Sequence, residues 1–151
     1  VGIAALMGGR SEDAVLAEAR SKLRYVTLDS LDEGVFHTNT PRRYGSVVAK
    51  PAAIGEIDAF VSHSWHDDPA AKWAALRAWR DAFKATHAGR EPKLWLDRAC
   101  INQEDIASDL RCLPVYVSAC TSLVALAGPS YLGRLWVLAE LTIFSQMGGT
   151  P

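Results

Sequence analysis

The chain has 151 residues, of which 49% are hydrophobic and 22% charged, and its formal net charge is −1. This length supports one domain with a core of its own, and the charge argues against a protein that binds the phosphate backbone of a nucleic acid. No secretory signal is visible, and no apolar run approaches the roughly 18 residues that cross a bilayer, so we expect no membrane span.

Residues 1–55 predict an N-terminal extension that is partly helical and partly irregular. Ser11 is a good N-cap for a helix over Glu12–Leu23. The stretch DSLDEGVFHTNTPRRYGSVVAKPAAIGE then carries many Gly, Pro, Thr and Asn residues, which predicts loops with one short strand near Ser46–Ala49. We assign the remainder, residues 56–151, to one α/β domain.

A short strand and a long helix open the α/β domain. The segment IDAFVSHS predicts the strand. The next segment, HDDPAAKWAALRAWRDAFKATHAG, predicts a helix with Asp67 or Asp68 as its N-cap, Pro69 in its first turn and Gly89 at its end. Its apolar side chains recur at near-helical spacing: Trp73, Leu76, Trp79 and Phe83.

Two further strands, each followed by a helix, complete the pattern. KLWLD predicts the second strand, and EDIASDLRCL predicts a helix that Pro114 must kink or restart. TSLVALAG is a continuous apolar run, typical of a strand that is buried on both faces. After the turn GPSY, the segment LWVLAELTIFSQ predicts a helix whose apolar residues are buried, Leu135 and Leu138 included.

This alternation of strands and helices predicts a parallel sheet with right-handed crossovers and helices on both faces. In such sheets, ligands bind beyond the carboxyl ends of the strands. The loops that follow the predicted strands are SHSWHDD, DRACINQED and GPSYLGR, and they hold most of the polar and reactive side chains of this region. We therefore expect them to meet at one edge of the sheet and to form the ligand site.

Glu140 stands out in the last helix, because it is the only ionisable residue between Arg134 and the end of the sequence. Trp136, Glu140 and Ile143 fall on one helical stripe. A buried carboxylate without a partner costs roughly several kcal/mol through desolvation. Three interpretations of Glu140 are open. It is paired, with Arg134 or a backbone donor, or it faces solvent on a helix that is less buried than its composition indicates, or it is a functional carboxylate with a raised pKa in a cleft.

Three segments carry a family likeness. IDAFVSHSWHDD is similar to the first strand and loop of Toll/interleukin-1 receptor (TIR) domains, in which D-x-F-[IVL]-S precedes a polar loop. LWVLAEL resembles the W-C-L-x-E-L segment of plant TIR domains, and SLVALAGPSYLGRLW resembles their third strand and its turn. The resemblance covers about Ile57–Phe144. It implies a flavodoxin-like α/β fold, a parallel sheet with helices on both faces.

The resemblance also implies a function in signalling and protein interaction. In the TIR domains that are enzymes, the glutamate of this helix is required to cleave NAD between nicotinamide and ribose, and the matching residue here is Glu140. NAD would then be a substrate, and no cofactor or metal is implied. We expect the substrate pocket to be formed by the side chains of Ser62, His63, Trp65, Asp97 and Trp136.

The chain departs from the TIR pattern in ways that keep a second function open. The loop with His63 and Trp65 lacks the arginine or small polar residue that many catalytic members have there, and RACINQED lacks a glycine. A TIR domain has five strands, whereas this sequence ends after the third helix, which leaves the edge of the third strand open unless something covers it. Three explanations are compatible with this: the sequence is a fragment of a longer chain, residues 1–55 cover the edge, or a partner protein covers it. The alternative is a non-catalytic TIR-like subunit or scaffold that binds like domains or other protein chains.

The same loops carry residues that suit two other kinds of chemistry. His63, His66, Asp67 and Asp68 can bind a metal ion in principle, but helix capping and ordinary loop histidines explain them without one. Cys100 follows a strand, where a neighbouring cation would lower the pKa of its thiol and suit a Cys–His hydrolase. The cysteines Cys100, Cys112 and Cys120 otherwise follow no metal spacing and are typical of reduced thiols, so we expect an intracellular, cytoplasmic protein.

Overall fold

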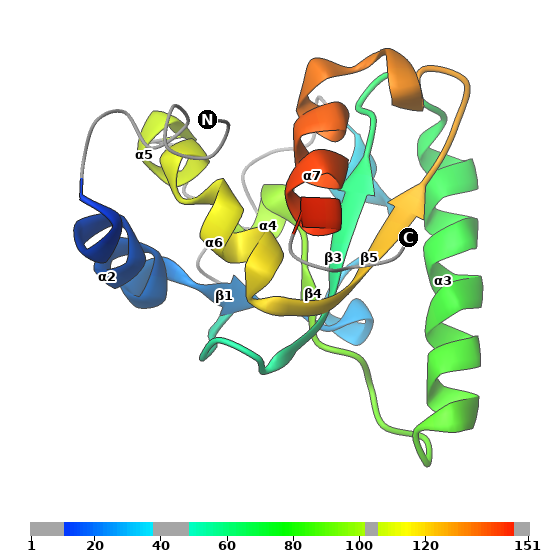
Figure 1. The fold of residues 1–151 in the computed structure, drawn as a ribbon. Coiled ribbons are helices and arrows are strands. Elements are labelled where there is room, and N and C mark those ends of the chain that lie inside the picture. The colour runs from blue at the N-terminus through cyan, green and yellow to red at the C-terminus, as the bar shows by residue number, and fades with distance from the viewer. Residues whose placement is uncertain (1–10, 38–48, 102–105, 147–151) are drawn as a thin grey trace.

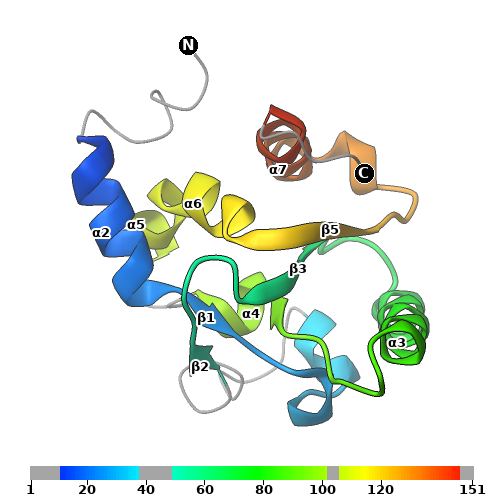
Figure 2. The ribbon, with the colours of Figure 1, turned by 60° about the horizontal axis from the view of Figure 1, so that its bottom comes forward.

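The computed structural model describes residues 11–37, 49–101 and 106–146. A parallel sheet of three strands, in the order β4-β3-β5, forms its centre. The strands are β3 (Ile57–His63), β4 (Leu94–Trp95) and β5 (Cys120–Leu126). Helices α6 and α7 lie on one face of the sheet, and α3 lies on the other (Figure 1 and Figure 2). This mixed α/β arrangement confirms the predicted parallel sheet and is compatible with a flavodoxin-like fold.

The middle strand, β3, is buried along almost all of its length. It pairs with β5 from Ile57↔Cys120 to His63↔Leu126, and with β4 at Ala59↔Leu94 and Phe60↔Trp95. Since its neighbours run in the same direction, the strands end at one edge of the sheet, which is the upper edge in Figure 1. This edge carries the loops that sequence analysis selected.

Strand β5 differs from expectation, because it is not buried on both faces. Thr121 and Ala125 are exposed, while Val124 and Leu126 are buried. Within the described residues, β5 has a strand partner on one side only, which makes it an edge strand with part of its surface exposed. A run of apolar residues does not reveal this, because Val, Leu and Ala are also tolerated on a half-covered surface.

Helix α3 (Pro69–Thr86) begins and ends as predicted. Asp68, not Asp67, is the N-cap, and its Oδ1 accepts the N–H of Ala71 at 2.9 Å. The end is closed by Gly89, which has a φ of +78° and donates its N–H to the carbonyl of Lys84 at 2.8 Å. A glycine suits this position because it adopts a positive φ without steric strain.

Three short helices connect β4 to β5: α4 (Asp97–Cys100), α5 (Ile106–Arg111) and α6 (Leu113–Ser118). Pro114 stands in the first turn of α6, with Cys112 as the N-cap. A proline lacks the N–H that this position would leave unpaired, so it restarts the helix instead of kinking a longer one. The segment PVYVSAC that follows Leu113 is thus mostly helical.

The N-terminal segment packs against the sheet. Helix α2 (Glu12–Lys22) starts at Ser11, whose Oγ accepts the N–H of Ala14 at 3.3 Å. Strand β1 (Arg24–Tyr25) pairs antiparallel with β2 (Lys50–Pro51), and Val26 exchanges two 2.8 Å backbone hydrogen bonds with Leu94 of β4. The turns η1 (Leu28–Ser30) and η2 (Glu33–Phe36) follow β1.

The boundary between an extension at 1–55 and a domain at 56–151 stays a prediction. Buried side chains of the first segment, such as Leu23 and Phe36, belong to the same hydrophobic core as the sheet. The short strand expected near Ser46–Ala49 falls mostly outside the described residues.

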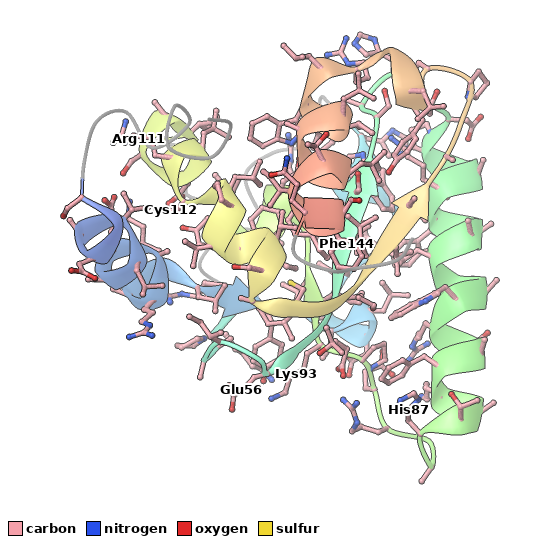
Figure 3. All side chains as sticks on the ribbon, in the orientation of Figure 1. Glu56, His87, Lys93, Arg111, Cys112 and Phe144 are labelled. Carbon is pink, nitrogen blue, oxygen red and sulfur yellow. The ribbon has the colours of Figure 1, made fainter. Side chains whose placement is uncertain are left out.

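Helix α7 (Leu135–Gln146) follows the short turn η3 (Tyr131–Gly133) and covers the sheet beside α6. Side chains fill the layer between α7 and the strands (Figure 3). The expectation that Leu135 and Leu138 are buried is wrong, since 84% and 42% of their surfaces are exposed. One stripe of this helix faces the protein, and the leucines lie on the opposite side. No helix among the described residues has both the length and the apolar character to cross a membrane.

Candidate functional site

The loops that follow the parallel strands meet around a cavity of about 350 Å³. It lies at the carboxyl edge of the sheet, where ligands bind in open parallel sheets. Each loop contributes polar or aromatic side chains, and this confirms that the loops converge. The lining includes His63 and Trp65 after β3, Asp97 and Arg98 after β4, and Arg134 and Trp136 at the start of α7.

The six residues predicted to form the site divide into two groups. His63, Trp65, Asp97 and Trp136 line the cavity, whereas Ser62 and Glu140 do not. Both are buried in the adjoining layer, with 3% of Glu140 and none of Ser62 exposed. The carboxyl group therefore lies behind the cavity wall and not at its surface.

The carboxyl group of Glu140 belongs to a short chain of hydrogen bonds. The Ser62 hydroxyl donates to its Oε2, and the hydroxyl of Tyr131 donates to Ser62 Oγ at 2.9 Å. Arg134, one of the partners considered for Glu140, forms no ion pair with it in the described part of the chain. A neutral hydroxyl from the neighbouring strand, and not a cation, is thus the partner of this buried acid.

Burial raises the pKa of Glu140 to about 8. The negative charge of Asp97 raises this pKa too, while hydrogen bonds from Ser62 and Trp136 oppose the increase by favouring the ionised form. The carboxyl group is therefore mostly protonated at neutral pH. It can still ionise within reach of physiological pH, which is a property of many functional carboxyl groups.

His63 lies between the cavity and the core. Its Nε2 is 3.4 Å from Asp97 Oδ1, and its ring packs edge-on against Phe36 and Trp65, with centroid distances of 5.0 and 4.6 Å. Its Nδ1 is buried and has no hydrogen-bond partner among the described residues. Since buried polar atoms are nearly always paired, an unpaired nitrogen on a residue that lines the cavity is a candidate hydrogen-bond partner for a ligand.

Lys72 is a residue of this region that sequence analysis missed. Only 3% of it is exposed, and its Nζ donates to the carbonyl oxygen of Ser64 at 2.8 Å. The ammonium group also lies over the rings of Phe36 and Trp65, at 5.2 and 5.7 Å from their centroids, and burial lowers its pKa. Lys72 precedes Leu76 by four residues, and this helical spacing could have placed it on the buried stripe of α3.

Asp67 ties the loop after β3 to the loop after β5. Its Oδ1 accepts the N–H of Ser130 at 2.9 Å, and the hydroxyls of Ser64 and Ser130 lie 2.6 Å apart. Gly128 passes so close that a Cβ there would be 2.5 Å from the Asp67 carboxyl carbon. These contacts fix the backbone on one side of the cavity.

The alternative chemistries find no support in this geometry. No group of three or more His, Cys, Asp or Glu side chains in the described part of the chain could hold a metal ion, and Asp68 is occupied as a helix cap. The low thiol pKa that a Cys–His hydrolase would need is not found at Cys100, because burial raises the pKa of this thiol to about 12. A thiol that stays protonated is a poor nucleophile.

Comparison of the chain with protein-family models, with curated proteins and with solved structures gives no match.

Proposed function

We propose that this chain is a TIR-like domain that binds NAD in the cavity and cleaves the bond between nicotinamide and ribose, with Glu140 as the catalytic carboxylate. One observation carries the proposal. A buried carboxyl group with a pKa of about 8 lies one helical turn from Trp136, which lines a cavity at the carboxyl edge of a parallel sheet.

Cleavage of the bond between nicotinamide and ribose requires few catalytic groups from the protein. The nicotinamide ring of NAD is positively charged, so it leaves as a neutral molecule without a general acid. The ribose carbon becomes positively charged in the transition state, and an ionised carboxylate stabilises that charge. Water then adds to the same carbon and releases a proton, and the products are nicotinamide and ADP-ribose.

The position and charge state of Glu140 add two requirements. The bound pyridinium ring would favour the ionised form of the carboxyl group, because an opposite charge nearby lowers the pKa of an acid. Because Trp136 lines the cavity and Glu140 does not, the indole must move for the carboxylate to approach the ribose. We therefore expect catalysis to depend on a rearrangement of the Trp136 side chain.

Release of nicotinamide from NAD by the purified chain tests this proposal. We expect release by the wild type, with a rate that rises as the pH approaches about 8, and none by Glu140→Gln. Glu56→Gln is the matched control, because Glu56 is exposed at the far end of the sheet (Figure 3). Equal release by the wild type and Glu140→Gln, or no release at any protein concentration, would overturn the proposal.

A non-catalytic TIR-like subunit or scaffold is the second candidate. Leu132, Leu135 and Leu138 are 68%, 84% and 42% exposed along η3 and α7, an arrangement typical of a surface that binds another protein. Sedimentation across a range of concentrations, with and without Leu135→Asp, tests for self-association. Concentration-dependent assembly that this substitution abolishes favours the scaffold function, and a monomer at all concentrations argues against binding between like domains.

A further inference from the structure

Among the described residues that line the cavity, basic side chains outnumber acidic ones. Arg98 and Arg134 line it from different elements, and Asp97 is the acidic residue among its described lining. The whole chain, in contrast, has a net charge of −1. Arginine side chains from separate elements that line one cavity are a common means of binding an anionic group.

Arg134 is placed where an anion is also favoured by the backbone. Its side chain is exposed and forms no ion pair or side-chain hydrogen bond within the described residues. It directly precedes α7, and Trp136 and Val137 of the first turn line the same cavity. The N–H groups of a first helical turn have no partner within the helix and carry a partial positive charge, which favours an anion there.

His63 sets a second requirement, which concerns the hydrogen bonds that the ligand forms. If its Nε2 carries the proton and faces Asp97, the buried Nδ1 is an acceptor without a donor. A ligand that satisfies it must present a hydroxyl or amide hydrogen inside the cavity. A sugar hydroxyl can donate this hydrogen bond while a phosphate group on the same ligand contacts the arginines.

The volume of the cavity limits the size of the ligand. Ligand pockets commonly span roughly 300–1,000 Å³, so a cavity of about 350 Å³ is at the small end. We expect it to enclose one sugar phosphate and to leave the remainder of a dinucleotide outside.

We propose that the cavity binds a phosphorylated sugar, with the phosphate between Arg98 and Arg134 at the start of α7 and a sugar hydroxyl on His63 Nδ1. The inference rests on the proposed function in one respect, namely that this cavity is the ligand site. It adds the chemical group that is bound, and it implies that a ribose phosphate of NAD occupies the cavity while the rest of the molecule lies outside.

Calorimetric titration with ribose 5-phosphate, inorganic phosphate and ribose tests the inference. We expect ribose 5-phosphate to bind the wild type more tightly than phosphate does, and ribose to bind undetectably. Arg134→Gln should weaken binding of ribose 5-phosphate by roughly 10-fold to 100-fold, because it removes a charge-assisted contact. Arg77→Gln is the control, since Arg77 is exposed on α3 and does not line the cavity.

Each outcome is decisive. Equal affinity for phosphate and ribose 5-phosphate, unchanged affinity in Arg134→Gln, or no binding of ribose 5-phosphate would overturn the inference. Because ribose 5-phosphate has no bond to nicotinamide, its binding without any release of nicotinamide from NAD would support the inference while the proposed cleavage fails. Conversely, nicotinamide release with the same KM in wild type and Arg134→Gln would overturn the inference and leave the proposed cleavage intact.

Discussion

The hydroxyl of Ser62 at the end of β3 donates a hydrogen bond to the buried carboxyl group of Glu140 in α7, 78 residues further along the chain. Tyr131 donates to the same Ser62 Oγ, so the three side chains link the middle strand, the turn after β5 and the last helix. This link holds Glu140 in position behind the cavity. It also means that the ionisation of one carboxyl group affects the stability of the whole fold.

The ionisation of Glu140 should lower the free energy of unfolding of the wild type as the pH rises from about 4.5 to about 8. The pKa of this carboxyl group is about 8 in the folded protein and 4.5 without the fold, so between these values the unfolded chain loses a proton that the folded chain keeps. The contribution is complete below the lower value and is lost above the higher one. It amounts to roughly 5 kcal/mol in the free energy of unfolding.

Urea unfolding of the wild type and Glu140→Gln across this pH range measures the effect. Glutamine stays neutral, so the free energy of unfolding of Glu140→Gln should not decrease over this pH range. The variant should therefore become more stable relative to the wild type as the pH approaches 8. Glu56→Gln should keep the pH dependence of the wild type, because Glu56 is exposed. Parallel curves for the wild type and Glu140→Gln would contradict a raised pKa at this position.

Much of the fold was predictable because its signals are local. The cap at Asp68, the proline after it and the glycine at Gly89 define α3 within a few residues, and hydrophobic runs locate the strands. What β5 and α7 bury was not predictable, since this depends on which neighbours cover them. Leu135 and Val137 have similar hydrophobicity, but one is 84% exposed and the other 1%.

The loops that form the candidate site were predictable from the sequence, but the burial of Glu140 behind the cavity was not. The rule that parallel strands share a carboxyl edge brought His63, Asp97 and Trp136 to one cavity. It did not place Glu140 behind the wall, because that requires the side-chain packing of Ser62 and Tyr131. Lys72 was missed because a lysine on a helix is usually exposed.

Replacement of Lys72 by methionine should destabilise the protein. Methionine fills similar space but removes the hydrogen bond to the Ser64 carbonyl and leaves the carboxylate of Asp67 without its buried cation. We expect a loss of roughly 3 kcal/mol in the free energy of unfolding, because a buried partner is left uncompensated. Thermal or urea unfolding measures it.

Lys84→Met is the matched control on the same helix. Lys84 pairs with Glu91 at 3.2 Å near the surface, where an ion pair contributes about 1 kcal/mol or less. Equal losses for the two variants would show that the burial of Lys72 has no special consequence for stability.

Gly128→Ala should destabilise the loop after β5. The new methyl group would lie 2.5 Å from the carboxyl carbon of Asp67, so either the loop or Asp67 must shift. We expect a loss of about 1–3 kcal/mol, typical of overpacking, and weaker ligand binding because Ser130 is held by the same carboxylate. Unfolding and binding titrations measure the two effects.

Gly133→Ala provides the comparison, since a Cβ at Gly133 meets no atom within 4 Å and its effect should stay within about 0.5 kcal/mol. Adding Asp67→Ala to Gly128→Ala should destabilise less than the sum of the single changes, because the two closest clashing atoms, the carboxyl carbon and Oδ2 of Asp67, are then absent. Additive losses would indicate that the close approach is relaxed elsewhere.

The thiols of Cys100, Cys112 and Cys120 should be unreactive in the folded protein. All are buried, and burial raises the pKa of each, to about 12 for Cys100. Cys112 lies between α2 and the helices α5 and α6 (Figure 3), so this segment must separate before it is reached. Only a thiolate attacks a disulfide reagent, and a protonated, enclosed thiol offers almost none.

Reaction with Ellman's reagent measures this directly. We expect no rapid release of chromophore from the native chain and reaction of all three cysteines in concentrated guanidinium. Rapid reaction of one native thiol that Cys100→Ala abolishes would contradict the burial of Cys100 and make a cysteine nucleophile possible again. The expected silence leaves the carboxyl group of Glu140 as the reactive group next to the cavity, which is the assignment that the nicotinamide assay tests.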